Sequence, residues 1–143
     1  MKIINGDILD VKDGYICYPV TCKGAMPVGL VKRVMDEYPE VFKEYNEKVD
    51  NRKKSLSGDI QLIPEEDGKI FVNMFSQDDC GCVGYFTSHE AFEQCLAKLK
   101  EVYNKEKNVY FAYRTGCDIG GGNWETISGL IEKYFPEAII IKK

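Results

Sequence analysis

The chain contains a single histidine, His89, and no apolar run of the roughly 18 residues that a membrane-spanning helix requires. Its first residues also lack the long apolar stretch and the cleavage site of a secretory signal peptide. We therefore expect no membrane partner and a cytoplasmic location. A length of 143 residues, 44% of them hydrophobic, is sufficient for one domain with its own core, which we assign to residues 1–143.

An excess of positive charge is absent as well. The chain carries 19 lysines and arginines against 23 aspartates and glutamates, for a net charge of −4. Broad nucleic-acid binding needs a basic face, so this class of function is disfavoured. The one short basic cluster, Arg52-Lys53-Lys54, is more typical of a solvated loop.

Paired Cys-x-x-Cys spacings, which structural zinc sites prefer, are missing from the sequence. Without a secretion signal, a disulfide framework is also disfavoured. Two of the cysteines, Cys17 and Cys95, fall on apolar positions of a predicted strand and a predicted helix, where a thiol acts as a small hydrophobe. We therefore expect no cofactor, and we expect none of the six cysteines to bind a metal. They are Cys17, Cys22, Cys80, Cys82, Cys95 and Cys117.

Hydrophobic periodicity predicts alternating strands and helices along the chain. Strands are expected at residues 3–4, 15–20, 59–63, 69–75, 108–113 and 138–141. Helices are expected at 28–38, from Pro39 through Tyr45, from a capping box of Thr87 and Glu90 onward, and from an Asn123 cap to Pro136. This alternation favours an α/β fold whose mixed, largely parallel sheet is covered on both faces. The aromatic strand 110–113 is expected in its core.

Two loops follow strands of this sheet at the end where open α/β sheets bind ligands. The first loop spans residues 21–29, and the second spans 114–122. Glycine-rich backbone in front of a helix can turn several N–H groups toward an anion such as a diphosphate. The alternative is a plain surface turn. The second loop does not have P-loop or Gly-x-Gly-x-x-Gly spacing, and it contains Thr115, Gly116, Cys117, Asp118, Ile119, Gly120 and Gly121.

Four stretches of the chain, taken in order, resemble macrodomains, in particular the compact phage and bacterial branch related to ADP-ribose 1″-phosphate phosphatases. They are Asn5-Gly6-Asp7-Ile8-Leu9, then residues 20–30 with Tyr38-Pro39, then 58–62 with 72–77, and finally 116–121 with Trp124-Glu125. The resemblance covers nearly the whole length. It implies a three-layer α/β/α macrodomain that binds an ADP-ribose-type ligand, either free or attached to a protein.

The resemblance also implies roles for particular residues. Asp7 and Ile8 would hold adenine, and Thr21 would lie near the distal ribose. Backbone at Gly29 and Leu30 and along the second loop would hold the diphosphate. Independently of the resemblance, Lys23 and Arg114 would add positive charge to the two loops, but residues of this kind are more often simply solvated at the surface. The sequence of residues 78–85, and not the resemblance, predicts a flap near the cleft.

Departures from the family pattern bear on catalysis. Tyr18 stands where some relatives carry the histidine credited with phosphatase chemistry, and Gln77 and Gly120 stand where hydrolases of a neighbouring branch use Lys and Asp. Pro27, Val28 and Asp118 replace glycines. Asp118 is then the best catalytic candidate, ahead of Cys22 or Cys117 as nucleophiles. The alternative for Asp118 is a structural role, as a turn residue that hydrogen-bonds its own backbone. Three hypotheses remain: a hydrolase, a non-catalytic reader, and a remodelled cleft for another ligand.

Overall fold

One mixed, mostly parallel sheet organises the molecule. A computed structural model describes residues 1–22, 24, 29–78, 86–117 and 122–143. Within these residues the strands follow the order β1-β7-β6-β2-β4-β3, with β5 added to β4. Among the described strands, only β3 and β5 run antiparallel to their neighbour β4. The strands are β1 (Lys2–Asn5), β2 (Gly14–Thr21), β3 (Ile60–Pro64), β4 (Lys69–Asp78), β5 (Phe86–Thr87), β6 (Val109–Ala112) and β7 (Ile139–Lys142).

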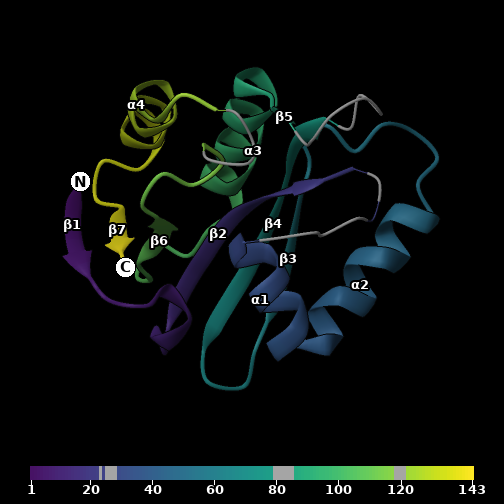
Figure 1. Cartoon of the computed structure of the whole chain (residues 1–143), viewed down its shortest axis with the longest axis horizontal. Coiled ribbons are helices and arrows are strands. Elements are labelled where there is room, and N and C mark those ends of the chain that lie inside the picture. Colours follow the sequence, from purple (N-terminus) through teal and green to yellow (C-terminus); the bar gives the residue numbers. More distant parts are fainter. Residues whose placement is uncertain (23, 25–28, 79–85, 118–121) are drawn as a thin grey trace.

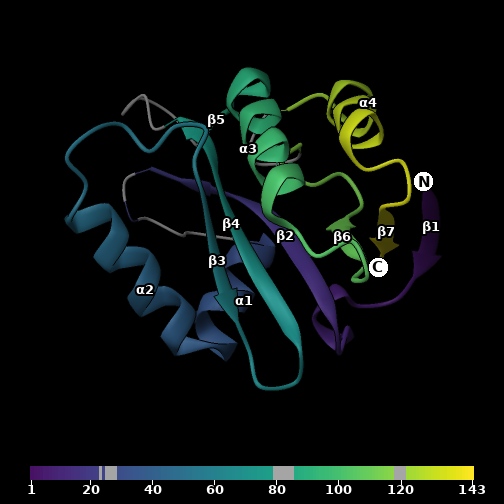
Figure 2. The ribbon, with the colours of Figure 1, turned by 180° about the vertical axis from the view of Figure 1, so that it is seen from behind.

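Helices cover both faces of the sheet, as Figures 1 and 2 show from opposite sides. One hydrophobic cluster lies between the sheet and the pair α1 and α2, and another lies between the sheet and the pair α3 and α4. The predicted three-layer α/β/α fold is therefore confirmed. The helices are α1 (Gly29–Glu37), α2 (Pro39–Asp50), α3 (His89–Val102) and α4 (Trp124–Tyr134), and a short 3₁₀ helix, η1 (Ile8–Asp10), follows β1.

Strand β2 shows why the sequence folds this way. Every residue of β2 is buried, as its nearly continuous apolar run predicts for a central strand. Its side chains alternate between the two clusters: Ile16 and Tyr18 pack toward α1 and α2, and Tyr15 and Cys17 pack toward α3 and α4. Cys95 is buried beside Cys17, so both thiols are core residues, as expected. Residues of the aromatic strand β6 pack against both clusters, which confirms its core position.

Several boundaries differ from the expectation. Helix α2 continues to Asp50, beyond the end expected at Tyr45, because Val49 gives it one more buried turn. The predicted capping box at Thr87 is wrong. Ser88 is the N-cap of α3 and accepts from the Ala91 N–H, whereas the Thr87 hydroxyl donates to the Gly116 carbonyl oxygen. Within α2, Phe42 is exposed, whereas Val41 and Tyr45 are buried.

The topology brings the carboxyl ends of β1, β2, β4, β6 and β7 to the same edge of the sheet, since these strands are parallel. The first and second loops follow β2 and β6 at this edge. Asp7 and Lys143 also lie here, because each follows the carboxyl end of one of the paired parallel strands β1 and β7, which Figure 1 shows side by side. In the part of the chain that is described, no helix is both long and apolar enough to cross a bilayer.

Candidate functional site

An open groove of about 660 Å³ lies at this edge of the sheet, and we call it the carboxyl-end groove. Apolar side chains from four elements line it: Ile8, Leu30, Ala112 and Ile141. Charged side chains lie around them, namely Asp7, Lys32, Arg33, Asp36 and Lys143. The groove thus brings Asp7 and Ile8 together with Gly29 and Leu30, although the two pairs are about 20 residues apart in the sequence.

Asp7 is the most heavily bonded side chain of the groove. It is the N-cap of η1, where its Oδ1 accepts from the Leu9 N–H at 3.0 Å. The Arg33 guanidinium donates to both carboxylate oxygens, through Nη1 to Oδ1 at 3.2 Å and through Nη2 to Oδ2 at 2.7 Å. Lys143 Nζ lies 3.3 Å from Oδ2. The hydrogen bond from Arg33 holds the pKa of Asp7 well below its usual range, so the carboxylate is ionised near neutral pH.

The described part of the first loop is fastened by Tyr45 of α2. The Tyr45 hydroxyl donates to the Thr21 carbonyl oxygen at 2.7 Å, lies 2.9 Å from the Thr21 hydroxyl, and accepts from the Gly24 N–H at 3.0 Å. Thr21, predicted near a ribose, is 1% exposed. Its described contacts make it an anchor of the loop. Lys23 and residues 25–28, including Pro27 and Val28, lie outside the described residues.

The described part of the second loop is folded on itself. The Thr115 N–H bonds the Ala112 carbonyl, the Cys117 N–H bonds the Arg114 carbonyl, and the Gly122 N–H bonds the Gly116 carbonyl. The backbone amides of Thr115 and Cys117, which we predicted as diphosphate donors, are therefore already engaged within the loop. The remaining predicted donors, Asp118, Ile119, Gly120 and Gly121, lie outside the described residues.

Two contacts, one from β5 and one from the first residue of α3, hold the described part of the second loop in place. The Thr87 hydroxyl bonds the Gly116 carbonyl oxygen at 2.8 Å, and the Asn123 N–H donates to Nε2 of His89 at 3.2 Å. No sequence pattern indicated this role for Thr87 and His89, and none indicated a place at the site for Arg33, Tyr45 and Lys143. The only available signal was the position of Arg33 one helical turn after Gly29-Leu30, which places it on the same side of α1.

Candidate titratable groups near the site have unfavourable surroundings for catalysis. Tyr18 is 1% exposed, and burial raises its pKa well above the usual value. Cys117 is buried, with its Sγ directed at the Thr115 carbonyl oxygen at 3.4 Å. Arg114 is exposed and has a left-handed backbone with φ of 61°, which helps to start the turn. Asp118, our candidate catalytic residue, and the predicted flap beyond Asp78 fall outside the described residues.

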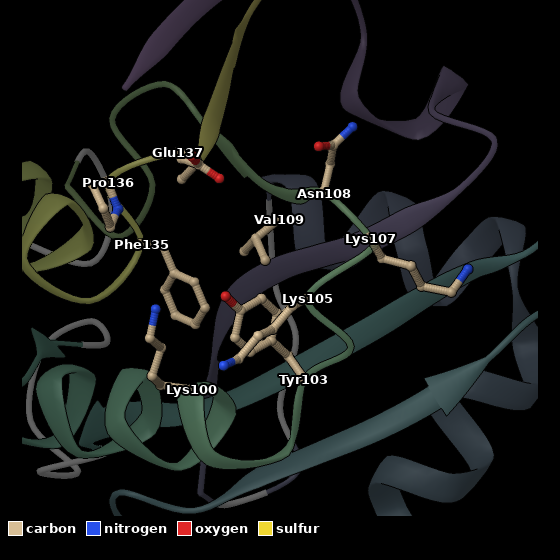
Figure 3. A pocket seen from close by; sticks show the side chains of 10 residues that line it. Lys100, Tyr103, Lys105, Lys107, Asn108, Val109, Phe135, Pro136 and Glu137 are labelled. Atoms are coloured by element: carbon tan, nitrogen blue, oxygen red, sulfur yellow. The ribbon is translucent and has the colours of Figure 1, made fainter.

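A second, smaller pocket of about 170 Å³ lies at the opposite edge of the sheet, near the start of β6 and β7. Figure 3 shows Lys100 beside the rings of Tyr103 and Phe135. Lys100 Nζ is 5.4 Å and 5.3 Å from the two ring centroids, a cation–π arrangement that closes this corner of the fold. No described residue of either predicted loop lines this pocket, so it does not correspond to the expected cleft.

Comparison of the fold with solved structures gives extensive matches. A protein of unknown function from Bacteroides thetaiotaomicron superposes with a TM-score of 0.85 at 19% identity, covering 99% of this chain and 96% of that one. The macrodomain of Mycobacterium tuberculosis DarG gives 0.82 at 19% identity, with coverage of 99% and 95%. Thermosipho africanus DarTG, solved in complex with ADP-ribose, gives 0.80 at 19% identity, with coverage of 99% of this chain and 41% of that chain.

These similarities define the class of fold. The chain has a macrodomain-like α/β fold, matched over nearly its whole length. No protein-family profile matches the chain, and no curated protein matches it in sequence. The fold resemblance predicted from the four sequence stretches is therefore confirmed at the level of three-dimensional structure.

Proposed function

We propose that this chain binds ADP-ribose or a derivative of it in the carboxyl-end groove. The observation that carries the proposal is the position of this groove, at the carboxyl ends of parallel strands and against the start of α1. A groove of about 660 Å³ is within the size range of small-molecule sites. The structural similarity to a DarTG protein solved with ADP-ribose supports the same ligand class.

In this proposal the base lies among the apolar side chains of Ile8, Leu30, Ala112 and Ile141, beside Asp7. The diphosphate lies at the start of α1, where the N–H groups of Gly29 and Leu30 are among those without a helical partner, and along the second loop. The three cations of the groove are offset by neighbouring acids; Lys32, for example, pairs with Asp36 at 2.6 Å. Recognition of the phosphates would therefore depend mainly on backbone N–H groups.

Binding without catalysis fits the described residues better than phosphatase chemistry does. A general base must lie within reach of the reacting atom and titrate near the working pH. Tyr18, at the position where some relatives carry a histidine, is buried, and its pKa is raised. Gln77 has no ionisable group. Hydrolysis would then depend on Asp118, and Asp118→Asn tests it: undiminished turnover of ADP-ribose 1″-phosphate would remove Asp118 as the acid or base.

Isothermal titration calorimetry with ADP-ribose tests the binding itself. We expect saturable heat from the unmodified chain and at least about tenfold weaker binding by Leu30→Glu, because the new carboxylate would lie among the apolar side chains that surround the base. Glutamate is tolerated in the first turn of a helix, which limits the cost in stability. Leu62→Glu is the matched control, since Leu62 is an exposed leucine on the edge strand β3.

A phosphate-release assay with ADP-ribose 1″-phosphate, run alongside, separates a reader from an enzyme. Saturable heat without phosphate release supports the non-catalytic reader. A flat titration with ADP-ribose and with its 1″-phosphate would overturn the proposal and would indicate that the cleft has been remodelled. Equal binding by the Leu30→Glu and Leu62→Glu variants would place the ligand elsewhere.

A further inference from the structure

Asp7 has no remaining capacity to receive a base amino group. An ionised carboxylate offers about four acceptor positions. Here Oδ1 accepts from the Leu9 N–H and Arg33 Nη1, and Oδ2 accepts from Arg33 Nη2 and Lys143 Nζ. All four donors belong to the chain itself. The adenine contact that the family resemblance implies for Asp7 would require one of them to leave.

The contact with Arg33 is the hardest of these to displace. It is a two-pronged, charge-assisted pair, which is roughly twice as strong as a hydrogen bond between neutral groups. An adenine amino group is neutral, so exchanging it for the guanidinium is unfavourable. The carboxylate is also the less accessible partner: the Asp7 side chain is 21% exposed and that of Arg33 is 39% exposed.

Arg33 keeps donors that point away from Asp7. A guanidinium carries five N–H groups, and Asp7 takes two of them. The nearest other acid, Glu37, has its Oε2 3.8 Å from Nε, beyond hydrogen-bond distance. Because Arg33 lines the carboxyl-end groove, the base end of the groove presents hydrogen-bond donors in place of a carboxylate acceptor.

We propose that Arg33 is a specificity-determining residue that makes the groove prefer a 6-oxopurine, such as hypoxanthine, over adenine. A 6-oxopurine offers acceptors at O6 and N7, the pair that arginine recognises most often in nucleic acids. Adenine offers a donor at position 6, which would face the Arg33 donors. This inference rests on the proposed binding of an ADP-ribose-type ligand and specifies which base that ligand carries.

Titrations with ADP-ribose and inosine diphosphate ribose test the preference, because the two ligands differ in the base at position 6. We expect the unmodified chain to bind the inosine compound at least about fivefold more tightly, the lower end of base discrimination by arginine. Arg33→Met removes the donors and frees Asp7, so the preference should reverse in favour of ADP-ribose. Arg33→Lys, which keeps the charge without the two-pronged geometry, should lose most of the preference.

Lys32→Met is the matched control. Lys32 is the neighbouring cation of the same groove, but it pairs with Asp36, so its loss should leave the ratio of the two affinities unchanged. Thermal melting of each variant establishes that it is folded. If Arg33→Met does not fold, the ratio of the affinities for the inosine compound and ADP-ribose, measured for the unmodified chain and for Arg33→Lys, still tests the role of Arg33.

The outcomes separate this inference from the proposed function. If the unmodified chain binds ADP-ribose as tightly as inosine diphosphate ribose, or more tightly, the proposed role of Arg33 is overturned. The proposed binding of ADP-ribose-type ligands would remain. The same ratio in the unmodified chain and in Arg33→Met would also overturn the role of Arg33. No heat with either ligand would overturn the proposed function and, with it, the base preference.

Discussion

The hydroxyl of Thr87 donates to the carbonyl oxygen of Gly116 at 2.8 Å, and this contact joins the start of α3 to the second loop. The same carbonyl accepts the N–H of Gly122, so one acceptor closes the loop and ties it to the neighbouring layer. The hydrogen bond that the Asn123 N–H donates to Nε2 of His89 adds a second connection, at the other end of the loop. The second loop is therefore held at both ends before any ligand arrives.

Thr87→Val removes the hydroxyl and keeps the shape of the side chain. We expect a loss of about 1 kcal/mol in the free energy of unfolding, the typical net value of one hydrogen bond, together with weaker ADP-ribose binding because the loop is less preorganised. Urea denaturation and calorimetry measure the two effects. Thr87→Ser, which keeps the hydroxyl, should retain the affinity; equal affinities of the valine and serine variants would contradict a role for the hydroxyl in ligand binding.

Gly116 should tolerate a side chain less well than Gly29 does, although both have a left-handed backbone, with φ of +74° and +76°. A Cβ on Gly116 would lie 3.1 Å from Thr87 Oγ1 and 3.2 Å from Pro19 Cγ, whereas a Cβ on Gly29 would contact nothing within 4 Å. We expect alanine at either position to cost about 1–2 kcal/mol from backbone strain, and Gly116→Ala to cost measurably more. Equal midpoints of urea denaturation for Gly116→Ala and Gly29→Ala would show that the second loop can shift to make room for the added methyl group.

Tyr18→Phe should leave the fold as stable as before or stabilise it by about 1 kcal/mol. The Tyr18 hydroxyl is buried and has no hydrogen-bond partner among the described residues, so removing it relieves an unsatisfied polar group. Ligand affinity should not change, because Tyr18 packs in the cluster beneath α1 and α2. Loss of turnover on ADP-ribose 1″-phosphate in this variant would instead assign the hydroxyl to catalysis.

Glu65 makes stability depend on pH. Burial, with the carboxyl of Glu40 and the charge of Asp67 nearby, raises the pKa of Glu65 from 4.5 to about 7. Between these values the folded protein holds a proton that the unfolded chain has released, so the free energy of unfolding falls as the pH rises from about 4.5 to 7. Glu65→Gln should remove this decline and stabilise the protein at pH 8 by about 1 kcal/mol, a value that allows for solvent screening.

Urea denaturation at pH 5 and pH 8 measures this effect, with Glu66→Gln as the control, because Glu66 is an exposed carboxylate in the same turn. The Glu66 variant should follow the unmodified chain at both pH values. A pH dependence that survives in Glu65→Gln would assign the titration to another group.

The sequence predicted the fold well because its signals are local. The apolar run of β2, the proline that starts α2 and the Asn123 cap of α4 each depend on neighbours within a few residues, and all are present. The predicted capping box at Thr87 is wrong because it, too, was based on the local sequence alone. Thr87 has a suitable local pattern, but its hydroxyl bonds Gly116, 29 residues away, and Ser88 caps the helix.

Alternating strands and helices also determined which edge of the sheet carries the two loops, since parallel strands end together. What tertiary structure alone decided is which side chains meet there. Arg33 reaches Asp7 across 26 residues, and Tyr45 reaches Thr21 across 24. These pairs depend on how α1 and α2 pack against the sheet. Hydrophobic periodicity does not encode this packing, because it specifies which face of a helix is buried and not which polar groups lie beside that face.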